Sequence, residues 1–374
     1  MIQRLFENII VKNSGKKKAI IILGARQVGK STLLNMLLKN MKNDILFWDG
    51  DEPDLRQKLD NVTSTQLKAM IGSSKILVID EAQRIKNIGI TLKLITDKIK
   101  DVQLYVSGSS SLELSNEINE PLTGRKYEFF LMPFSTQELI NHHGVTDEKR
   151  LLQHRLIYGF YPDIVCNPGD ETINLKNLVN SYLYKDIFNF NDVRKPEIIQ
   201  KLLKALALQI SSEVSYHELA QTAGCNIETV QRYIDLLEKS FIIFRLSSFN
   251  RNLRNELKKS RKIYFFDNGV RNALLGEYKD IELRSDSGAL WENFLISERQ
   301  KYLEYNQITT SNYFWRTKQQ QEIDYIEERD GKLFAYEFKW RQGKEAYFAK
   351  TFRNAYPNCT TKTITPENYL DFLL

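Results

Sequence analysis

The sequence predicts an α/β protein that begins with a parallel sheet built around a phosphate-binding loop. Three observations lead to this fold class. The apolar stretch Ala19–Leu23 runs directly into the pattern G-x-x-x-x-G-K-S at Gly24–Ser31, and a helical apolar stretch follows it. A second apolar run ends in two neighbouring carboxylates, Asp80 and Glu81. Near the C-terminus, a helical stretch precedes two alternating runs joined by Asp330-Gly331, which predicts a second α/β unit.

Composition limits the possible classes of protein. The chain has 374 residues, enough for two or three domains, and its 42% apolar and 27% charged residues are ordinary for a globular protein. Its apolar runs are too short to span a bilayer, and residues 1–18 predict an amphipathic helix and the basic turn Lys16–Lys18 rather than a secretion signal. Three distant cysteines argue against disulfides or zinc. We therefore expect a cytoplasmic location and no membrane partner, while the net charge of +6 supports nucleic-acid binding only weakly.

The Gly24–Ser31 stretch has the residue types that hold a nucleotide triphosphate. Gly24 and Gly29 let the backbone curl so that its N–H groups point at a phosphate, and the helix that follows adds its positive end. Lys30 is expected to reach the β- and γ-phosphates, and Ser31 to supply an oxygen to Mg²⁺. The predicted ATP contacts are Gly24, Ala25, Arg26, Gln27, Val28, Gly29, Lys30, Ser31 and Thr32.

The carboxylates Asp80 and Glu81 follow a buried strand, Lys75–Ile79, at the edge of the sheet where parallel strands end. Asp80 is expected to hold Mg²⁺, directly or through water, and Glu81 to polarise the attacking water. Adjacent carboxylates beside the phosphates are what ATP hydrolysis requires.

Two further residues have open interpretations. Ser109 follows the strand beginning at Leu104 and is either a sensor of the γ-phosphate or part of a serine-rich loop. Arg125 precedes the apolar strand Tyr127–Met132 and either reaches the γ-phosphate of a neighbouring subunit or lies solvated in a turn. The first interpretation of Arg125 requires a homo-oligomer.

The sequence resembles the prokaryotic predicted ATPases of the AAA+ superfamily, in which the ATPase precedes a C-terminal domain. The resemblance implies a parallel sheet with helices on both faces, ATP and Mg²⁺ as cofactors, and an arginine-finger role for Arg125. It spans nearly the whole chain and is carried by residues 24–31, 79–84, 106–111, 122–125, 131–138, 159–162, 184–187 and 262–267.

Residues 196–255 predict a winged helix. Pro196 opens a helix, Ser215 and Glu218 form a capping box before a short helix at residues 218–222, and Asn226 caps a third helix. Two β-type runs, 241–244 and 245–249, complete the pattern. The unit either contacts DNA or serves as a packing module. In the first case the contacts are Thr229 and Arg232, with the basic run Arg251, Arg254, Lys258, Lys259, Arg261 and Lys262 just beyond.

The C-terminal stretch predicts a hairpin with opposed acids. With Asp330-Gly331 as a type I′ turn, Asp324 faces Glu337 and Glu322 faces Lys339, all on one face. Ile323, Tyr325, Phe334, Tyr336 and Phe338 form the core on the other face. Two opposed acids destabilise a hairpin unless a cation neutralises them. A second Mg²⁺ or Mn²⁺ held by Asp324, Glu337 and a backbone carbonyl would do so, with Lys339 orienting or deprotonating a water.

The arrangement Asp324…Glu337-x-Lys339 is similar to the PD-(D/E)XK nuclease superfamily. Glu292 matches the extra acid that such folds often carry on their first helix, and it is the further expected metal ligand. Here Glu322-Ile323-Asp324 replaces the usual Pro-Asp pair, which leaves cleavage activity open.

Together these inferences predict four parts: an AAA+ core at residues 1–135, a helical lid or linker at 136–195, a winged-helix unit at 196–255 and a restriction-endonuclease-like α/β domain at 256–374. We expect an ATPase that binds and hydrolyses ATP with Mg²⁺ and acts on DNA through its C-terminal nuclease-like domain. The alternatives are an ATP-dependent regulatory switch with an inactive nuclease-like scaffold, and an interaction platform that binds only proteins.

Overall fold

The computed structural model describes residues 2–39, 41, 44–109, 118, 120–180, 195–250, 260–317, 319–341 and 348–374. The chain divides into two compact units, residues 1–133 with 239–241, and residues 134–238 with 242–374. The boundary expected after residue 135 falls close to the junction of these units. Those expected after residues 195 and 255 both fall inside the second unit.

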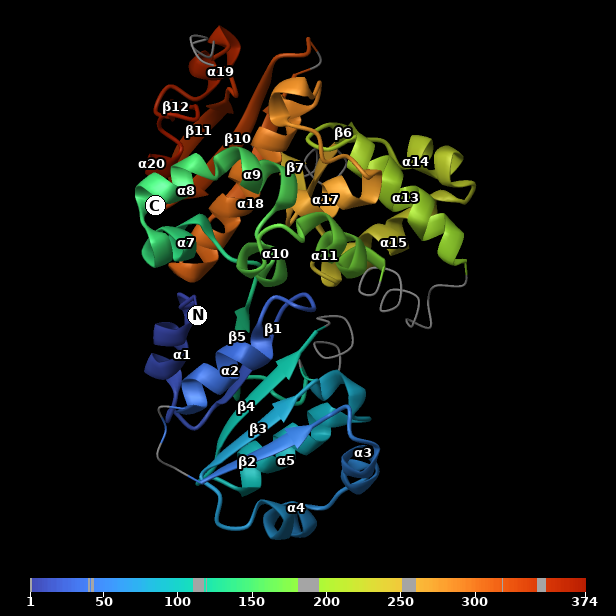
Figure 1. Cartoon of the computed structure of the whole chain (residues 1–374), viewed down its shortest axis with the longest axis vertical. Coiled ribbons are helices and arrows are strands. Elements are labelled where there is room, and N and C mark those ends of the chain that lie inside the picture. Colours follow the sequence, from blue (N-terminus) through green and yellow to red (C-terminus); the bar gives the residue numbers. More distant parts are fainter. Residues whose placement is uncertain are drawn as a thin grey trace. The chain divides into compact units, whose positions relative to one another are not determined.

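The first unit is a five-stranded parallel sheet with helices on both faces, as the sequence predicts (Figure 1). The strand order is β2-β3-β4-β1-β5, so β1 and β3 lie on either side of β4. The elements are α1 (Phe6–Asn13), β1 (Ala19–Leu23), α2 (Lys30–Lys39), β2 (Ile45–Asp49), α3 (Pro53–Leu59), α4 (Ser64–Ile71), β3 (Ile76–Asp80), a 3-10 turn (Ala82–Arg84), α5 (Ile88–Lys98), β4 (Gln103–Gly108) and β5 (Lys126–Phe130).

Alternating side chains of the parallel strands enter two apolar layers. Ile21 and Ile79 project into a cluster with Leu67 of α4 and Leu92 of α5. Other strand residues contact α1 and the residue after it. The ring of Phe129 packs edge to face against that of Phe6 of α1, and the Tyr105 hydroxyl is hydrogen-bonded to Ser14, just beyond α1. Because β1 is buried along its whole length, its C-terminal end and the loop after it are held firmly.

The second unit contains a seven-stranded mixed sheet in the order β12-β11-β10-β9-β7-β8-β6. Its first part is α7 (Thr136–His143), α8 (Val145–Arg150), α9 (Leu152–Tyr158), α10 (Pro162–Cys166), α11 (Glu171–Leu178), α13 (Pro196–Leu208), β6 (Glu213–Val214), α14 (Tyr216–Ala223), α15 (Ile227–Lys239) and β7 (Ile243–Ser248). The remainder is β8 (Arg261–Phe265), α17 (Asn268–Leu275), a 3-10 turn (Ile281–Leu283), α18 (Ser287–Tyr305), β9 (Ser311–Arg316), β10 (Glu322–Arg329), β11 (Lys332–Phe338), α19 (Lys350–Ala355), β12 (Thr360–Ile364) and α20 (Leu370–Leu373).

The helices expected between residues 196 and 240 are present, but the expected pair of strands is wrong. Ser215 caps α14, Gly224 ends it in the left-handed conformation, and Asn226 accepts a hydrogen bond from the Thr229 amide. Residues 243–248 then form one strand, β7, which pairs with β8 instead of folding back on itself. Residues 241–249 contain no glycine or proline that would turn the chain between the two expected runs.

The predicted C-terminal hairpin is confirmed in its turn and in the register from Tyr325–Tyr336 to Arg329–Lys332. Asp330 and Gly331 both have positive φ, at 50° and 71°, and Tyr325 pairs with Tyr336. The expectation of one apolar face is wrong, because both faces are covered. Ile326 and Ala335 pack against Phe352 of α19, while Tyr336 on the opposite face packs against Phe372 of α20. The expected core residue Phe334 is only partly buried.

Candidate functional site

The loop between β1 and α2 has the curled backbone that the sequence predicts. Gly29 and Gln27 have φ values of 94° and 60°, in the left-handed region. A Cβ atom on Gly24 would lie 2.1 Å from the carbonyl oxygen of Leu131, so only glycine fits between the loop and the segment after β5. The loop is therefore packed against the sheet.

Lys30 is the first residue of α2, and its side chain turns back into the loop. Its Nζ donates to the carbonyl oxygens of Gly24 at 3.0 Å and Ala25 at 2.9 Å. The residue is 5% exposed. A buried ammonium group beside the start of a helix is suited to receive a phosphate.

Asp80 at the end of β3 lies against the first turn of α2. The Ser31 hydroxyl donates to Asp80 Oδ2 at 2.7 Å, and the buried Ser107 hydroxyl of β4 donates to Asp80 Oδ1. The loop and the strand-end carboxylate, far apart in the sequence, are thus brought together. Hydroxyl and carboxylate oxygens are the ligands that Mg²⁺ prefers, so Ser31 and Asp80 fit this ion. Ser107 is a contact that the sequence reasoning missed, although it lies in the serine-rich stretch that contains Ser109.

Glu81 is held in an unusual backbone conformation beside a second missed residue, Gln83. Glu81 has φ 47° and ψ 43°, in the left-handed region that side chains other than glycine rarely adopt. The Gln83 amide donates to Glu81 Oε2 at 2.5 Å and to Ser109 Oγ at 2.8 Å, and Ser109 lies 3.3 Å from the same carboxylate. Ser109 therefore joins the cluster, while residues 110 and 111 of its stretch lie outside the described residues.

Arg4 is a further residue that the sequence reasoning missed. It joins the phosphate-binding loop to the segment after β5. Its guanidinium donates to the carbonyl oxygens of Val28 at 2.9 Å and Met132 at 2.5 Å. The side chain is 4% exposed. An isolated arginine ahead of an amphipathic helix has no sequence signal that would reveal this role.

Arg125 is not brought to this cluster within the chain. It precedes β5 at the sheet edge where β1 begins, and Ala19 donates its amide to the Arg125 carbonyl. Its Nε donates to Asp97 at 2.6 Å. The nucleotide residues lie at the opposite ends of the same strands, so any contact of Arg125 with a triphosphate requires another copy of the chain.

The second group of acids lies in the other unit, around the hairpin β10–β11. Lys262 of β8 donates to Glu292 of α18 at 2.9 Å and pairs with Glu322 at 2.5 Å. The Phe338 amide donates to Asp324 Oδ2 at 2.7 Å, and Lys339 donates to Glu337 Oε2 at 2.8 Å. Tyr264 also donates to Glu292, at 2.6 Å. The structure thus gathers Glu292, Asp324, Glu337 and Lys339, together with Lys262, Tyr264 and Glu322.

Burial and mutual repulsion shift the protonation of these acids. Burial raises the pKa of Glu292 to about 7, although Lys262 opposes the shift. Burial and the charge of Asp324 raise the pKa of Glu337 to about 7, and burial raises that of Asp324. For Lys262, burial lowers the pKa, but Glu292, Glu322 and Asp324 outweigh burial and the pKa lies above its ordinary value. Lys262 therefore stays charged and is the built-in cation of the cluster.

The fit of a metal ion to these acids is incomplete. Among the residues that the structure describes, no three His, Cys, Asp or Glu side chains are placed to hold one ion. Asp324 and Glu337 provide suitable oxygens, whereas Glu292 and Glu322 share a lysine that is 2% exposed.

The basic run expected to contact DNA is only partly described. Residues 251–259 lie outside the described residues, and Lys262 is buried against acids instead of exposed. It is unavailable to a DNA phosphate because it lies on a strand inside the unit. Arg232 on α15 is exposed, and Thr229 is partly buried.

Family models match three segments of the chain. Residues 16–140 match the AAA domain, and residues 149–280 and 287–368 match two domains of unknown function, DUF8612 and DUF4143. The first match, together with the loop and the parallel sheet, supports ATP binding and hydrolysis by the first unit. Among the described residues, no helix is both long enough and apolar enough to cross a bilayer.

Several uncharacterized proteins are similar to this chain over most of its length. The uncharacterized protein Rv2008c of Mycobacterium tuberculosis is 25% identical over 325 residues, covering 86% of this chain and 70% of that protein. The uncharacterized protein MJ1544 of Methanocaldococcus jannaschii is 23% identical over 367 residues, covering 86% and 78%. Among solved structures, the Thermotoga maritima RuvB Holliday junction branch migration motor is 16% identical, with a TM-score of 0.33 and coverage of 69% of this chain and 95% of that chain.

Proposed function

We propose that the first unit binds ATP with Mg²⁺ at the sheet edge where β1 and β3 end, and hydrolyses it there. The observation that supports this most is the 2.7 Å hydrogen bond between Ser31 and Asp80. It joins the phosphate-binding loop to the strand-end carboxylate through two oxygens suited to Mg²⁺. The AAA-domain match over residues 16–140 adds independent support.

Each residue has a distinct part in this proposal. The amides of residues 24–29 and the Lys30 ammonium group hold the phosphates, with Thr32 beside them. Ser31 and Asp80 hold the ion, which supplies charge neutralisation on the phosphates when bound. Glu81 orients the attacking water. The Gln83 amide fixes the Glu81 carboxylate and links it to Ser109, the proposed sensor of the γ-phosphate.

Substituting Lys30 tests this site. We expect Lys30→Ala to lower ATP hydrolysis by roughly a hundredfold or more, because one preorganised positive charge on the transferred group is lost. Lys39→Ala, at the exposed end of the same helix, is the matched control and should hydrolyse ATP normally. Normal hydrolysis by Lys30→Ala would refute the proposed site.

We also propose that Arg125 acts only between copies of the chain. Its position at the opposite edge of the sheet supports a role in trans over one within the chain. The mass in solution, measured with and without a non-hydrolysable ATP analogue, tests this. A monomer under both conditions excludes an arginine finger.

For the second unit we propose action on DNA through a nuclease-like domain. The order α18-β9-β10-β11-α19-β12 carries the helix acid Glu292 and the hairpin acids Asp324 and Glu337 into one neighbourhood. The order α13-β6-α14-α15-β7-β8, with Arg232 exposed on its third helix, supports a winged-helix unit beside it. In this proposal Asp324 and Glu337 supply the oxygens suited to a cation, Glu292 stays paired with Lys262, and Lys339 orients the attacking water.

An inactive scaffold is the second candidate, and a specific observation favours it. Lys262 lies between Glu292 and Glu322, and so supplies the positive charge that a metal ion would otherwise bring. Cleavage assays with Mg²⁺ or Mn²⁺ on several DNA and RNA substrates separate the two candidates. Cleavage that Asp324→Ala abolishes supports the nuclease, and its absence with every substrate supports the scaffold.

A further inference from the structure

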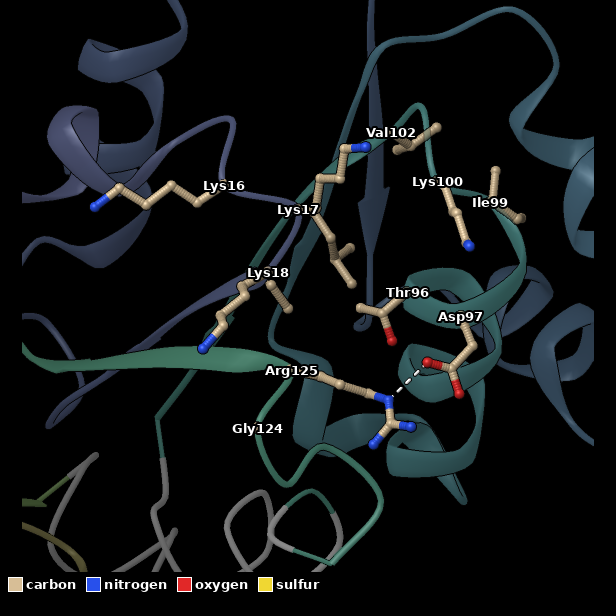
Figure 2. A pocket seen from close by; sticks show the side chains of 12 residues that line it. Lys16, Lys17, Lys18, Thr96, Asp97, Ile99, Lys100, Val102, Gly124 and Arg125 are labelled. Atoms are coloured by element: carbon tan, nitrogen blue, oxygen red, sulfur yellow. Dashed lines mark hydrogen bonds and ion pairs between the residues drawn. The ribbon is translucent and has the colours of Figure 1, made fainter.

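A basic pocket lies at the sheet edge opposite the proposed nucleotide site. It has a volume of about 340 Å³ and is formed by the turn before β1, the end of α5 with the loop after it, and the turn before β5 (Figure 2). Five of its lining residues carry a positive charge and one a negative charge, Asp97. The basic residues are Lys16, Lys17, Lys18, Lys100 and Arg125.

The positive charge of the pocket is only partly neutralised. Asp97 accepts a hydrogen bond from Arg125 Nε at 2.6 Å, as Figure 2 shows. The exposed Lys17 and Lys100 make no ion pair with any residue that the structure describes. Five like charges gathered around one cavity repel each other, and an anion that entered the cavity would relieve the repulsion.

The basic turn is fixed in place before any ligand binds. Gln103 at the start of β4 accepts from the Gly15 amide at 2.7 Å and donates to the Lys18 carbonyl at 2.9 Å. Lys17 has φ 56°, a left-handed conformation that costs a lysine on the order of 1 kcal/mol. Gln103 therefore holds the turn by hydrogen bonds on both sides of Lys17.

An aromatic ring stands beside the same lysines. Lys18 Nζ lies 4.9 Å from the centre of the Tyr127 ring, and Lys16 Nζ lies 5.7 Å from it. Lysines interleaved with an aromatic side chain are typical of surfaces that bind nucleic-acid strands.

We propose that this pocket binds the phosphodiester backbone of nucleic acid. Lysines from separate segments act as point charges that suit successive phosphates, and the Tyr127 ring beside them is the kind of aromatic face on which a base can stack, which an acidic peptide would not use. An acidic peptide is therefore the less favoured partner. The inference deepens the proposed action on DNA, since it assigns a contact with the strand to the ATPase unit itself.

The test compares DNA binding by the full chain and by Lys17→Ala/Lys100→Ala, using fluorescence anisotropy with a labelled mixed-sequence duplex at several salt concentrations. We expect roughly tenfold weaker binding and a salt slope smaller by about 2, because each substitution leaves one phosphate without its lysine. Lys58→Ala/Lys68→Ala, which removes two exposed lysines outside the pocket, is the matched control and should bind as the unaltered protein does.

Three results would overturn the inference. They are no DNA binding by the unaltered chain, a salt slope that the double variant leaves unchanged, and binding of poly-glutamate as tight as that of DNA through the same two lysines. ATP hydrolysis is measured in parallel and should be unchanged in both double variants. Loss of DNA binding with intact hydrolysis therefore stays distinguishable from failure of the proposed ATPase.

Discussion

The two acid clusters of this chain differ in what lies against their carboxylates. In the first unit, Asp80 accepts hydrogen bonds from the hydroxyl groups of Ser31 and Ser107. In the second, Glu292 and Glu322 share the buried ammonium group of Lys262. The sequence predicts a metal ion at both clusters. The carboxylate of the first cluster is hydrogen-bonded to neutral hydroxyl groups, whereas two carboxylates of the second are paired with a positive charge.

The difference shows how the partner of a carboxylate decides its chemistry. A hydroxyl leaves the negative charge uncompensated and can itself become a metal ligand, so the first cluster is prepared for a cation. A buried lysine instead supplies the opposite charge from within the chain, so removing it would leave the acids without a partner. The acids of the second cluster that lie outside the Lys262 pairs, Asp324 and Glu337, are the ones whose role the cleavage assay decides.

The largest expected effect comes from removing the built-in cation. Lys262→Met would leave the largely buried Glu292 and the partly exposed Glu322 without their shared partner, and we expect the second unit to lose about 3–5 kcal/mol of unfolding free energy. Urea unfolding of the full chain, followed by tryptophan fluorescence, measures this loss. Lys339→Met is the matched control, since Lys339 is 34% exposed and its pairing with Glu337 should contribute less than about 1 kcal/mol.

Lys262→Met also tests whether the two clusters really differ. If Mn²⁺ restores the stability of Lys262→Met, the acids accept a metal ion once the lysine is gone, and the two clusters are alike. If the unfolding free energy does not change, Lys262 is not what neutralises the acids.

The next effect concerns activity in the first cluster. Asp80→Asn keeps the shape of the side chain but removes the charge that would hold Mg²⁺, so we expect ATP hydrolysis to fall by roughly a hundredfold. Its unfolding free energy should change by about 1 kcal/mol or less, because the amide can still hydrogen-bond to a serine. A large loss of stability would instead give Asp80 the structural role that we assign to Lys262.

Much of the first cluster could be predicted from the sequence, because short stretches of neighbouring residues specify it. The loop pattern and the apolar runs fix where β1, α2 and β3 begin and end, and parallel pairing brings their active ends to one edge. Gln83 and Arg4 could not be predicted in this way. Their contacts depend on side chains that meet only after folding, at 2.5 Å from Glu81 and from the Met132 carbonyl.

The second cluster was harder to predict, since its partners come from distant segments. The turn at Asp330-Gly331 sets the register that pairs Tyr325 with Tyr336, next to the acids Asp324 and Glu337. Lys262 lies in the sequence beside a basic run, which is typical of an exposed face, but strand β8 carries it into the interior. The apolar side chains on both faces of the hairpin pack against helices α18, α19 and α20. No local sequence pattern specifies where these helices lie.

A smaller effect tests whether paired charges in the second unit stabilise it as Lys262 does. Burial raises the pKa of Asp286, but Arg284 and Arg271 outweigh burial and lower it to about 2. Because the folded-state pKa lies below that of the unfolded chain, the stabilisation is complete above about pH 4 and is lost as the pH falls toward 2. We expect Asp286→Asn to cost about 1–2 kcal/mol near neutral pH, after allowing for partial exposure. In urea unfolding at a series of pH values the difference from the unaltered protein should shrink below about pH 4, and a pH-independent difference would contradict the assignment.

The smallest effect concerns the backbone of Glu81, which is left-handed within the first cluster itself. At φ 47° asparagine is tolerated better than most side chains, so Glu81→Asn should be more stable than Glu81→Ala by about 0.5–1 kcal/mol. Both variants should lose ATP hydrolysis to a similar extent, because both lack the carboxylate that orients water. Thermal unfolding and a phosphate-release assay on the two variants measure these quantities. Equal stabilities would mean that the left-handed backbone is relaxed, and hydrolysis by either variant would show that the carboxylate is not the group that activates water.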